Sequence, residues 1–290
     1  QRLVGDEVGA GDRDPPGRVL NEGQEHPQIR LGGVARAGGH QLHGVDDSAR
    51  PPRTRCAVSD DGARLRDEPP GAGVSADSGL KTFRDSDGLW EGHRVEEVAT
   101  PEAFDRNPQL VIDFYNERRR QARAARPNAA HLALARLQDS YDVQIITQNV
   151  DDLHERAGSR TVLHLHGELN KLRSTVDEDY VIDWTTDQKL TDLDRNGNRL
   201  RPFIVWFGES VPLIEQAAEW VAQADRVIVV GTSLKVYPAA GLLRFAPAHA
   251  ERYLVDPRPP AAPGVHIIAA TAAEGVPPLV DELLAQAGQA

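Results

Sequence analysis

An α/β fold built on a parallel, doubly wound sheet is predicted for residues 71–290. Strand-like apolar segments alternate along this stretch with segments in which apolar residues recur at helical spacing, a pattern typical of such a sheet. Two of the strand-like segments, 143–147 and 226–230, are rich in β-branched residues, as expected of strands buried on both faces. Each is followed by polar or glycine residues, which in this fold class lie at the edge of the sheet where ligands bind.

The helices are bounded by identifiable residues. Pro101 suits the first turn of a helix, where its missing N–H is not needed. Pro108 is expected to divide the first long helical segment in two, because proline breaks the ladder of hydrogen bonds. The expected elements are a turn with a short helix at 71–79, helices at 101–123 and 127–139, strands at 143–147, 161–165 and 203–206, a helix at 212–224, strands at 226–230, 252–255 and 266–269, and a helix at 276–286.

Residues 168–200 interrupt this alternation. They are polar and charged, and residues 194–198 (Asp-Arg-Asn-Gly-Asn) form a strong turn signal. We expect them to form a small lobe inserted into the main domain.

Residues 1–70 differ in composition from the rest of the chain. They contain no Phe, Tyr, Trp or Lys and a single isoleucine, Ile29, whereas Gly, Pro, Arg, Asp and Glu are abundant. Such a segment buries too little apolar surface to offset the entropy lost on ordering, which favours a disordered tail. The same composition is typical of out-of-frame translation of a GC-rich gene, so a misassigned segment is the alternative.

The change at Gly71 predicts that the first strand of the sheet is missing. A phosphate-binding Gly-Ala-Gly turn ordinarily follows a buried strand. Here residues 63–70 precede it, with two prolines and four charged residues. They cannot form a central strand, which must donate ladder hydrogen bonds and be apolar on both faces.

Composition also limits the classes of function. A net charge of −11 disfavours sequence-independent binding to nucleic acid, which needs clustered positive charge. No apolar run reaches the roughly 18 residues of a membrane span and no signal peptide is visible, so a cytoplasmic protein without membrane association is expected. The single cysteine, Cys56, rules out an internal disulfide and a multi-cysteine zinc site.

Four short motifs occur in a suggestive order. They are Gly71-Ala-Gly-Val-Ser-Ala-Asp-Ser-Gly79 running into Thr82-Phe-Arg-Asp85, then Thr147-Gln-Asn-Val-Asp-Asp-Leu-His154, His164-Leu-His-Gly167 and Gly231-Thr-Ser-Leu234. Together, over residues 71–290, they resemble the sirtuins, a family of NAD-consuming protein-lysine deacylases. The resemblance implies a Rossmann-like sheet with a small inserted lobe.

The first motif is the candidate cofactor loop. Its glycines allow the backbone to approach a pyrophosphate, and the N-terminus of the following helix favours an anion. An isolated Gly-x-Gly more often marks an ordinary turn, and the continuation through Thr82 favours the cofactor. By resemblance, Phe83 shields the bond between nicotinamide and ribose, and Arg84 lies in a mobile cofactor-binding loop. The NAD-binding residues implied here are Gly71, Ala72, Gly73, Ser75, Asp77, Thr82, Phe83 and Arg84.

Polar residues after two predicted strands complete the cofactor site. Gln148, Asn149 and Asp151 follow strand 143–147, where amide and carboxylate groups are placed to hold a carboxamide and a ribose hydroxyl. The alternative is that such residues cap the following helix. We prefer the cap for Asp152, whereas the resemblance favours binding for Asn149 and Asp151. On the adenosine side, the resemblance implies Gly231, Thr232, Ser233, Asp256 and Ala272.

His166 is the candidate catalytic base. An unperturbed histidine has a pKa near 6.5, so it can accept a proton at neutral pH. The resemblance assigns the catalytic role to the histidine directly before Gly167, and His154 and His164 are interpreted as structural. A histidine-based metal site is a weaker alternative because the His-x-His pair lacks a third ligand, so no metal is predicted.

Two further segments are predicted to contact an acylated substrate. Tyr115 and Arg118 lie one helical turn apart and share a face. By resemblance to the desuccinylase and demalonylase branch, this pair recognises a negatively charged acyl end; the alternative is that Arg118 belongs to a solvated face. The second segment, residues 205–209, resembles the part of the sirtuins that binds the substrate peptide. An extended strand edge can bind a peptide by β-augmentation. The peptide-binding residues implied in this segment are Val205, Phe207, Gly208 and Glu209.

The resemblance therefore implies an enzyme that removes acetyl groups, and succinyl or malonyl groups in preference if Arg118 faces the acyl chain, from lysines of proteins or peptides. NAD is consumed as a co-substrate, and nicotinamide and O-acyl-ADP-ribose are released. Because the lobe has no cysteine, the chain resembles the zinc-free bacterial branch. The alternatives are an NAD hydrolase or ADP-ribosyl transferase that uses the same pocket, and an inactive NAD-binding remnant that has lost its first strand.

Overall fold

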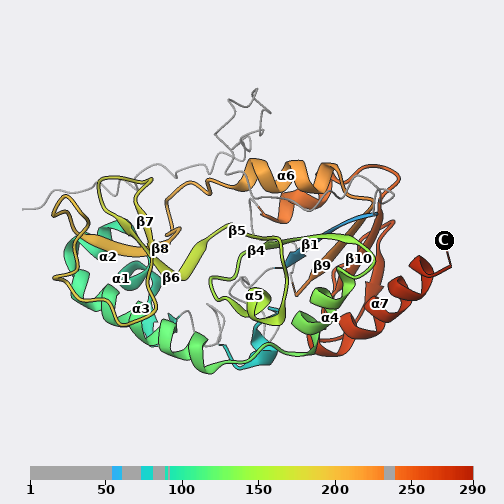
Figure 1. Cartoon of the computed structure of the whole chain (residues 1–290), viewed down its shortest axis with the longest axis horizontal. Coiled ribbons are helices and arrows are strands. Elements are labelled where there is room, and N and C mark those ends of the chain that lie inside the picture. The colour runs from blue at the N-terminus through green and yellow to red at the C-terminus, as the bar shows by residue number, and fades with distance from the viewer. Residues whose placement is uncertain (1–53, 61–72, 81–88, 91, 232–238, 290) are drawn as a thin grey trace, which may run out of the picture. The chain divides into compact units, whose positions relative to one another are not determined.

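The computed structural model describes residues 54–60, 73–80, 89–90, 92–231 and 239–289. Their centre is a six-stranded sheet in the order β11-β10-β9-β1-β4-β5, in which all neighbouring strands are parallel (Figure 1). The predicted doubly wound α/β fold is thereby confirmed. The strands are β1 (Arg55–Asp60), β4 (Asp142–Thr147), β5 (Val162–His164), β9 (Arg226–Val230), β10 (Glu251–Val255) and β11 (His266–Ile268).

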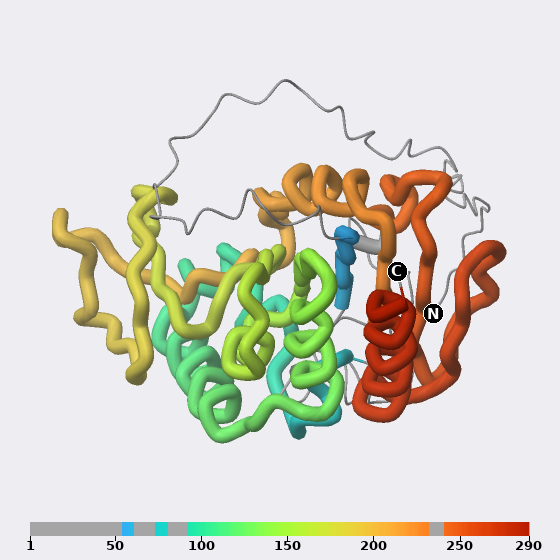
Figure 2. The backbone as a smooth tube through the Cα atoms, turned by 45° about the vertical axis from the view of Figure 1, so that its right-hand side comes forward, coloured from blue at the N-terminus to red at the C-terminus, as the bar shows by residue number. Residues whose placement is uncertain are grey.

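Helices cover both faces of this sheet (Figures 1 and 2). Alternate residues of a strand point to opposite faces, and β1 shows the consequence. Cys56 and Val58 enter the core on the side of α4 and α7, whereas Ala57 enters the core on the side of α6 and η2. Both faces are thus apolar, which explains the nearly continuous apolar strands. The covering elements are α4 (Ala129–Leu137), α7 (Ala272–Ala287), α6 (Ile214–Ala222) and η2 (Ala239–Phe245).

The prediction that the first strand is missing is wrong. β1 lies between β4 and β9, with Val58 opposite Ile145 on one side and Ile228 on the other. Cys56, Ala57 and Val58 are at most 1% exposed. The strand escaped prediction because it holds only three apolar residues between Arg55 and Ser59-Asp60.

The strand also lies well upstream of the Gly-Ala-Gly turn, not directly before it. Residues 55–60 therefore belong to the sheet, and the folded domain begins before the predicted boundary at Gly71. The rest of the predicted 1–70 segment, residues 1–53 and 61–70, lies outside the described residues. The inactive-remnant alternative loses its premise, because the central strand is present.

Residues 167–204 form a second, antiparallel sheet in the order β7-β6-β8, which we call the lobe. The strand expected at 203–206 begins earlier and belongs to the lobe. Pro108 divides the preceding helical segment as predicted, and Asn107 Oδ1 caps the second part by accepting from Leu110 N at 3.2 Å. The elements are α1 (Val95–Val98), α2 (Pro101–Arg106), α3 (Pro108–Ala124), β6 (Gly167–Ser174), β7 (Val181–Asp183) and β8 (Leu200–Ile204).

Short elements that the sequence analysis did not predict complete the chain. A hairpin precedes α1, and α5 follows the loop after β4. Their brevity gives too few residues for a period to be visible. They are β2 (Leu89–Trp90), β3 (His93–Arg94) and α5 (Leu153–Ala157), whereas the short helix that was predicted within 71–79 is η1 (Ala76–Ser78).

Buried polar side chains hold the lobe together. The Asp194 carboxylate accepts from Ser174 Oγ at 2.7 Å and from the backbone N–H groups of Asn196 and Asn198, each at 2.8 Å, within the predicted turn. On the α3 side, Asn116 Nδ2 donates to the Gln188 carbonyl and Asn116 Oδ1 accepts from Gln188 N, both at 2.8 Å. This reciprocal pair joins α3 to the lobe.

Replacing Asn116 with alanine is expected to lower the free energy of unfolding by about 2–4 kcal/mol, because it leaves buried groups without partners. The groups affected are the N–H and carbonyl of Gln188 and the Arg119 guanidinium, whose Nη1 donates to Asn116 Oδ1 at 2.7 Å. Chemical denaturation measures the change. Arg120→Ala is the control: Arg120 lies on the same helix and pairs with Glu117 of α3 and with Asp187 of the lobe, but both ion pairs are half exposed, so its loss should change stability by less than about 1 kcal/mol. Equal effects of the two variants would contradict this account.

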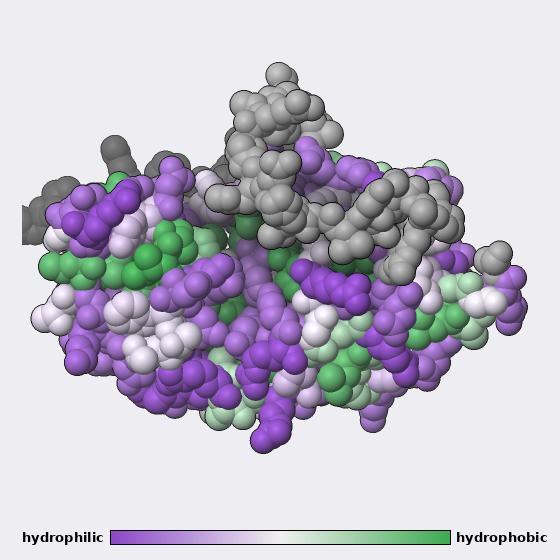
Figure 3. All heavy atoms as spheres, viewed as in Figure 1, coloured by the Kyte–Doolittle hydropathy of each residue, from purple (hydrophilic) through white to green (hydrophobic). Residues whose placement is uncertain are grey.

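Hydrophilic residues predominate on the face shown in Figure 3, and hydrophobic residues form small separate patches there. Among the described residues, none of the helices combines the length and the apolar character needed to cross a bilayer. The exposed large hydrophobic side chains of the described part are Leu132, Val176, Leu190, Leu193, Phe207 and Ile267.

Candidate active site

The candidate site lies where β1, β4 and β5 end. β1 is the point at which the strand order turns, since the chain continues to β4 on one side and to β9 on the other. Open α/β sheets bind ligands at such a switch point, outside the carboxyl ends of the strands. The loop of residues 148–152, between β4 and α5, begins there.

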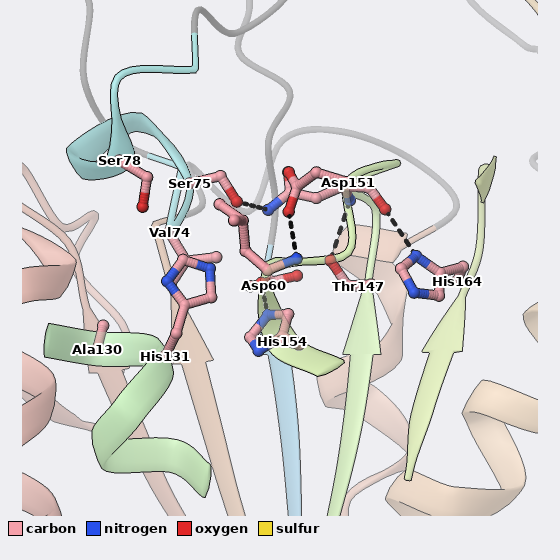
Figure 4. Close-up of polar contacts among 12 residues, drawn as sticks. Asp60, Val74, Ser75, Ser78, Ala130, His131, Thr147, Asp151, His154 and His164 are labelled. Atoms are coloured by element: carbon pink, nitrogen blue, oxygen red, sulfur yellow. Dashed lines mark hydrogen bonds and ion pairs between the residues drawn. The ribbon is translucent and has the colours of Figure 1, made fainter. Parts of the chain in front are cut away.

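Three of the predicted cofactor residues meet at this edge (Figure 4). Asn149 Nδ2 donates to Ser75 Oγ at 3.1 Å, and Asn149 N donates to Thr147 Oγ1 at 3.0 Å. Asp151 is buried beside them. Burial raises the pKa of its carboxyl, although the hydrogen bond from the Leu153 N–H and the charge of His154 act in the opposite direction. The structure therefore brings the 71–79 and 147–154 motifs into contact.

The expected helix cap is shifted by one residue. Asp152 is the N-cap residue of α5 but makes no side-chain cap hydrogen bond. Asp151 Oδ1 instead accepts from Leu153 N at 3.1 Å, while Asp152 Oδ2 accepts from Asn170 Nδ2 at 3.1 Å. Asp151 thus combines a capping contact with its place in the site, and Asp152 links the loop to the lobe.

Gln148 offers an acceptor to a ligand. The side chain is buried, and its Oε1 has no hydrogen-bond partner among the residues that the structure describes. A buried unpaired carbonyl oxygen is unfavourable unless a ligand or water donates to it. A carboxamide N–H₂, as in nicotinamide, is a donor of the required kind, so the residues present fit an NAD molecule.

His166 lies in a two-residue turn between β5 and β6 whose geometry requires glycine at the next position. Gly167 has φ of 82°, and a Cβ added to it would lie 2.0 Å from the Phe203 carbonyl oxygen. The His166 carbonyl accepts from Val205 N at 2.9 Å, which places the predicted peptide-binding segment beside the candidate base. Burial lowers the pKa of His166, although a hydrogen bond with the Gln148 backbone opposes this, so the imidazole is neutral at neutral pH.

The predicted acyl-recognition pair lies in the interior of the α3–lobe junction. Tyr115 and Arg118 are both buried, and burial raises the pKa of the Tyr115 hydroxyl while the charges of Arg201 and Arg118 oppose the rise. Trp206 Nε1 donates to Tyr115 Oη at 3.0 Å. Arg118 Nη1 donates to Gln121 Oε1 at 3.4 Å. The alternative of a solvated Arg118 is wrong, because the side chain is buried.

The peptide-binding segment is braced by an ion pair that the sequence analysis missed. Arg201 donates to both carboxylate oxygens of Glu209, at 2.6 and 2.9 Å, and its guanidinium stacks 3.5 Å from the Trp206 ring. Glu209 was predicted to bind substrate, but its carboxylate is engaged here. Phe207 is half exposed. No local signal marks this ion pair, because the indole N–H of Trp206 finds its partner in Tyr115.

Other predicted cofactor residues have varied surroundings. Asp77 is exposed, and its Oδ2 accepts from Ala273 N at 2.9 Å at the start of α7. Asp256 is buried after β10, and its Oδ1 accepts from Arg258 N at 2.7 Å. Ala272 and Gly231 lie at the same edge, at the start of α7 and after β9. Gly71, Ala72, Thr82, Phe83, Arg84, Thr232 and Ser233 lie outside the described residues.

A buried charged pair beneath the site was not predicted. His154 Nε2 lies 2.7 Å from Asp60 Oδ2, both side chains are at most 2% exposed, and the His131 ring packs 4.8 Å from that of His154 (Figure 4). Burial opposes protonation of His154, but Asp60 outweighs it and raises the pKa, whereas burial lowers the pKa of His131 to about 3. His154 is structural in position, as interpreted, and it supports the start of α5.

Comparison with known proteins identifies the family. The Sir2 family profile matches residues 71–238, more than half of the chain. The chain belongs to the Sir2 family. This Sir2-family chain is 60% identical over 189 residues to an NAD-dependent protein deacylase of Aggregatibacter actinomycetemcomitans, a match that covers 65% of this chain and 91% of the relative. It is 49% identical over 223 residues to an NAD-dependent protein deacylase of Bacteroides thetaiotaomicron, covering 74% and 95%.

Solved Sir2 structures share the fold. A Sir2 homologue in complex with NAD superimposes with a TM-score of 0.68 at 37% identity, covering 81% of this chain and 91% of that one. Sir2Tm bound to a propionylated peptide gives a TM-score of 0.60 at 25% identity, covering 82% and 94%. The predicted sirtuin resemblance is confirmed, and this Sir2-family chain is an enzyme of the NAD-dependent protein deacylase type.

Proposed function

We propose that the chain uses NAD to remove acyl groups from lysine side chains of proteins, with a preference for succinyl- and malonyl-lysine over acetyl-lysine. The single observation that supports the preference is that Tyr115 and Arg118 are both buried, one helical turn apart, where α3 meets the lobe. A carboxylate that leaves water is stabilised only where charged and hydrogen-bonding groups receive it. A short neutral acetyl group makes no use of such groups.

The direction of one hydrogen bond strengthens this proposal. An indole N–H can only donate, so the bond from Trp206 makes Tyr115 Oη the acceptor. The Tyr115 hydroxyl hydrogen is then directed to a different acceptor. With the Arg118 guanidinium one helical turn away, a phenolic hydroxyl and a guanidinium lie on the same face of α3, and groups of these two kinds recognise carboxylates.

The chain's own residues account for the chemistry. When bound, NAD supplies the electrophilic ribose carbon and the ribose hydroxyls. In this proposal Gln148, whose Oε1 has no partner among the described residues, accepts a hydrogen bond from the carboxamide, and Asn149 and Asp151 hold polar groups of the ribose. His166 is the proton acceptor, because burial keeps it neutral and its turn lies beside the peptide-binding segment.

Replacing Arg118 with methionine tests the acyl preference. Because a hydrogen bond to a charged group contributes about 1.5–3 kcal/mol, kcat/KM for succinyl-lysine peptide should fall about 10- to 150-fold. Activity on the matched acetyl-lysine peptide should stay within about threefold, since no carboxylate is involved. Arg120→Met is the matched control on the exposed side of α3, and it should alter neither rate. Equal losses on both peptides in Arg118→Met would show that Arg118 does not recognise the acyl group.

We further propose that the lobe is stable without zinc. The only cysteine of the chain, Cys56, is buried in β1, and burial raises the pKa of its thiol to about 12, so it supplies no metal ligand to the lobe. The Asp194 turn and the Asn116–Gln188 pair supply polar contacts there. Chelation with EDTA should therefore leave both activity and melting temperature unchanged. A drop in either that added zinc restores would contradict this proposal.

A further inference from the structure

His164 ties the loop after β4 to two neighbouring elements. Its Nδ1 lies 3.0 Å from the Asn149 carbonyl oxygen, a contact drawn in Figure 4. Its Nε2 lies 2.8 Å from Glu155 Oε1. His164 is the last residue of β5, and Glu155 belongs to α5, so the imidazole bridges the strand, the loop and the helix. The side chain of His164 is 7% exposed and that of Glu155 is 41% exposed.

Only the protonated imidazole satisfies both contacts. A carbonyl oxygen and an ionised carboxylate can only accept, so both ring nitrogens must donate, which is possible in the imidazolium alone. The pKa values agree with this geometry: burial opposes protonation of His164, yet Glu155, with a smaller effect of Glu168, raises its pKa to about 9. The pKa of Glu155 is correspondingly lowered, since the hydrogen bond from His164 outweighs its burial.

His164 contacts the backbone of Asn149, which is a residue of the candidate NAD site. The Asn149 carbonyl accepts a hydrogen bond from His164 Nδ1, while the Asn149 side chain donates to Ser75 Oγ. His166, two residues after His164, is hydrogen-bonded to the backbone of the preceding loop residue, Gln148. Two histidines on either side of Leu165 therefore hold two consecutive peptide groups of this loop.

We propose that His164 and Glu155 form a positioning pair that orients Asn149 and its loop for NAD binding. The inference rests on the proposed function in that it takes Asn149 and Asp151 as residues that hold NAD. Both hydrogen bonds of His164 go to the loop after β4 and to α5, so loss of the pair should affect NAD and not the acylated peptide. This distinguishes it from His166, which is assigned to the later proton transfer.

Two variants break the pair in different ways. His164→Gln cannot donate in two directions, and Glu155→Gln removes the negative charge that keeps His164 protonated. Each should raise the dissociation constant for NAD, measured by calorimetry, about tenfold or more, because a hydrogen bond to a charged group is lost. The KM for NAD should rise in parallel, with the KM for peptide unchanged. Glu155→Asp keeps the charge and should restore most of the affinity.

His249→Gln is the matched control. This histidine is 70% exposed and 3.6 Å from Asp225, away from the loop, so the dissociation constant for NAD should not change. The inference is wrong if NAD binds to both His164→Gln and Glu155→Gln within twofold of wild type. If His164→Gln does not fold, Glu155→Gln decides alone, because the exposed Glu155 tolerates substitution. A wild-type chain that binds NAD without deacylating peptides would contradict the proposed function and leave this test intact.

The pH dependence of NAD binding gives a second readout. A raised histidine pKa means that the contribution of His164 is present below its pKa and is lost as pH rises through about 9. Wild-type affinity for NAD should therefore weaken near that pH. In Glu155→Gln the weakening should move towards the ordinary histidine pKa of 6.5. Identical pH profiles for the two proteins would overturn the inference.

Discussion

Replacing His166 with alanine is expected to lower kcat for deacylation by about 10²- to 10⁴-fold, the usual contribution of a positioned general base. Binding of NAD should be retained, because Ser75, Asn149 and Asp151 remain in place. Exchange of labelled nicotinamide into NAD should also persist, since the proposed role of His166 follows nicotinamide departure. Steady-state kinetics and the exchange assay, run on the same preparation, measure both effects. A parallel loss of exchange and deacylation would assign His166 to NAD binding.

The same residue should set the acidic limb of the pH profile. A base must be neutral, so activity is lost as pH falls through its pKa. Burial lowers the pKa of His166 from its ordinary value of 6.5, against the opposing hydrogen bond with Gln148. The midpoint of the acidic limb in kcat/KM is therefore expected below 6.5. A midpoint above that value would show that another group controls the limb.

Gly167→Ala should be among the most damaging single changes in the chain. The added Cβ would lie 2.0 Å from the Phe203 carbonyl oxygen and 3.0 Å from Ile204 Cα, which are backbone atoms of β8 and cannot rotate away. Backbone strain at positive φ and overpacking each cost about 1–3 kcal/mol, so we expect the free energy of unfolding to fall by about 3–5 kcal/mol. Any folded fraction should lose activity, because the displacement moves His166. Thermal and chemical denaturation measure the effect.

Gly197→Ala separates the two contributions. Gly197 has φ of 83°, matching Gly167, but an added Cβ there would meet nothing within 4 Å. In Gly197→Ala the free energy of unfolding should fall by only about 1–2 kcal/mol, the cost of a positive φ for alanine. Activity should be retained. Similar losses in the two variants would show that the contact with Phe203 is unimportant.

The sequence predicted the fold wherever several apolar residues share one period. Strands such as 226–230 and the helices divided at Pro108 were predicted within a few residues of their observed bounds. β1 was not, because Cys56, Ala57 and Val58 show too short an apolar run to stand out between charged residues. Its place in the sheet comes from pairing with β4 and β9, which are distant in sequence.

The candidate site was predictable as a set of residues but not as a set of contacts. The motif after β4 predicted Asn149 and Asp151 because polar residues after a buried strand lie at the ligand edge. The bond between Trp206 and Tyr115 joins residues 91 positions apart, and nothing local indicates it. His164 was interpreted as structural, since its contacts with Asn149 and Glu155 depend on how β5 and α5 are placed.

The most direct test of the central claim is mass spectrometry of the products formed from NAD and matched acetyl- and succinyl-lysine peptides. The account predicts O-acyl-ADP-ribose and free lysine from both peptides, with a higher kcat/KM for the succinyl peptide. NAD consumed to ADP-ribose without acyl transfer would contradict it and indicate a hydrolase. If the folded chain neither consumes NAD nor deacylates a peptide, that result would also contradict the account.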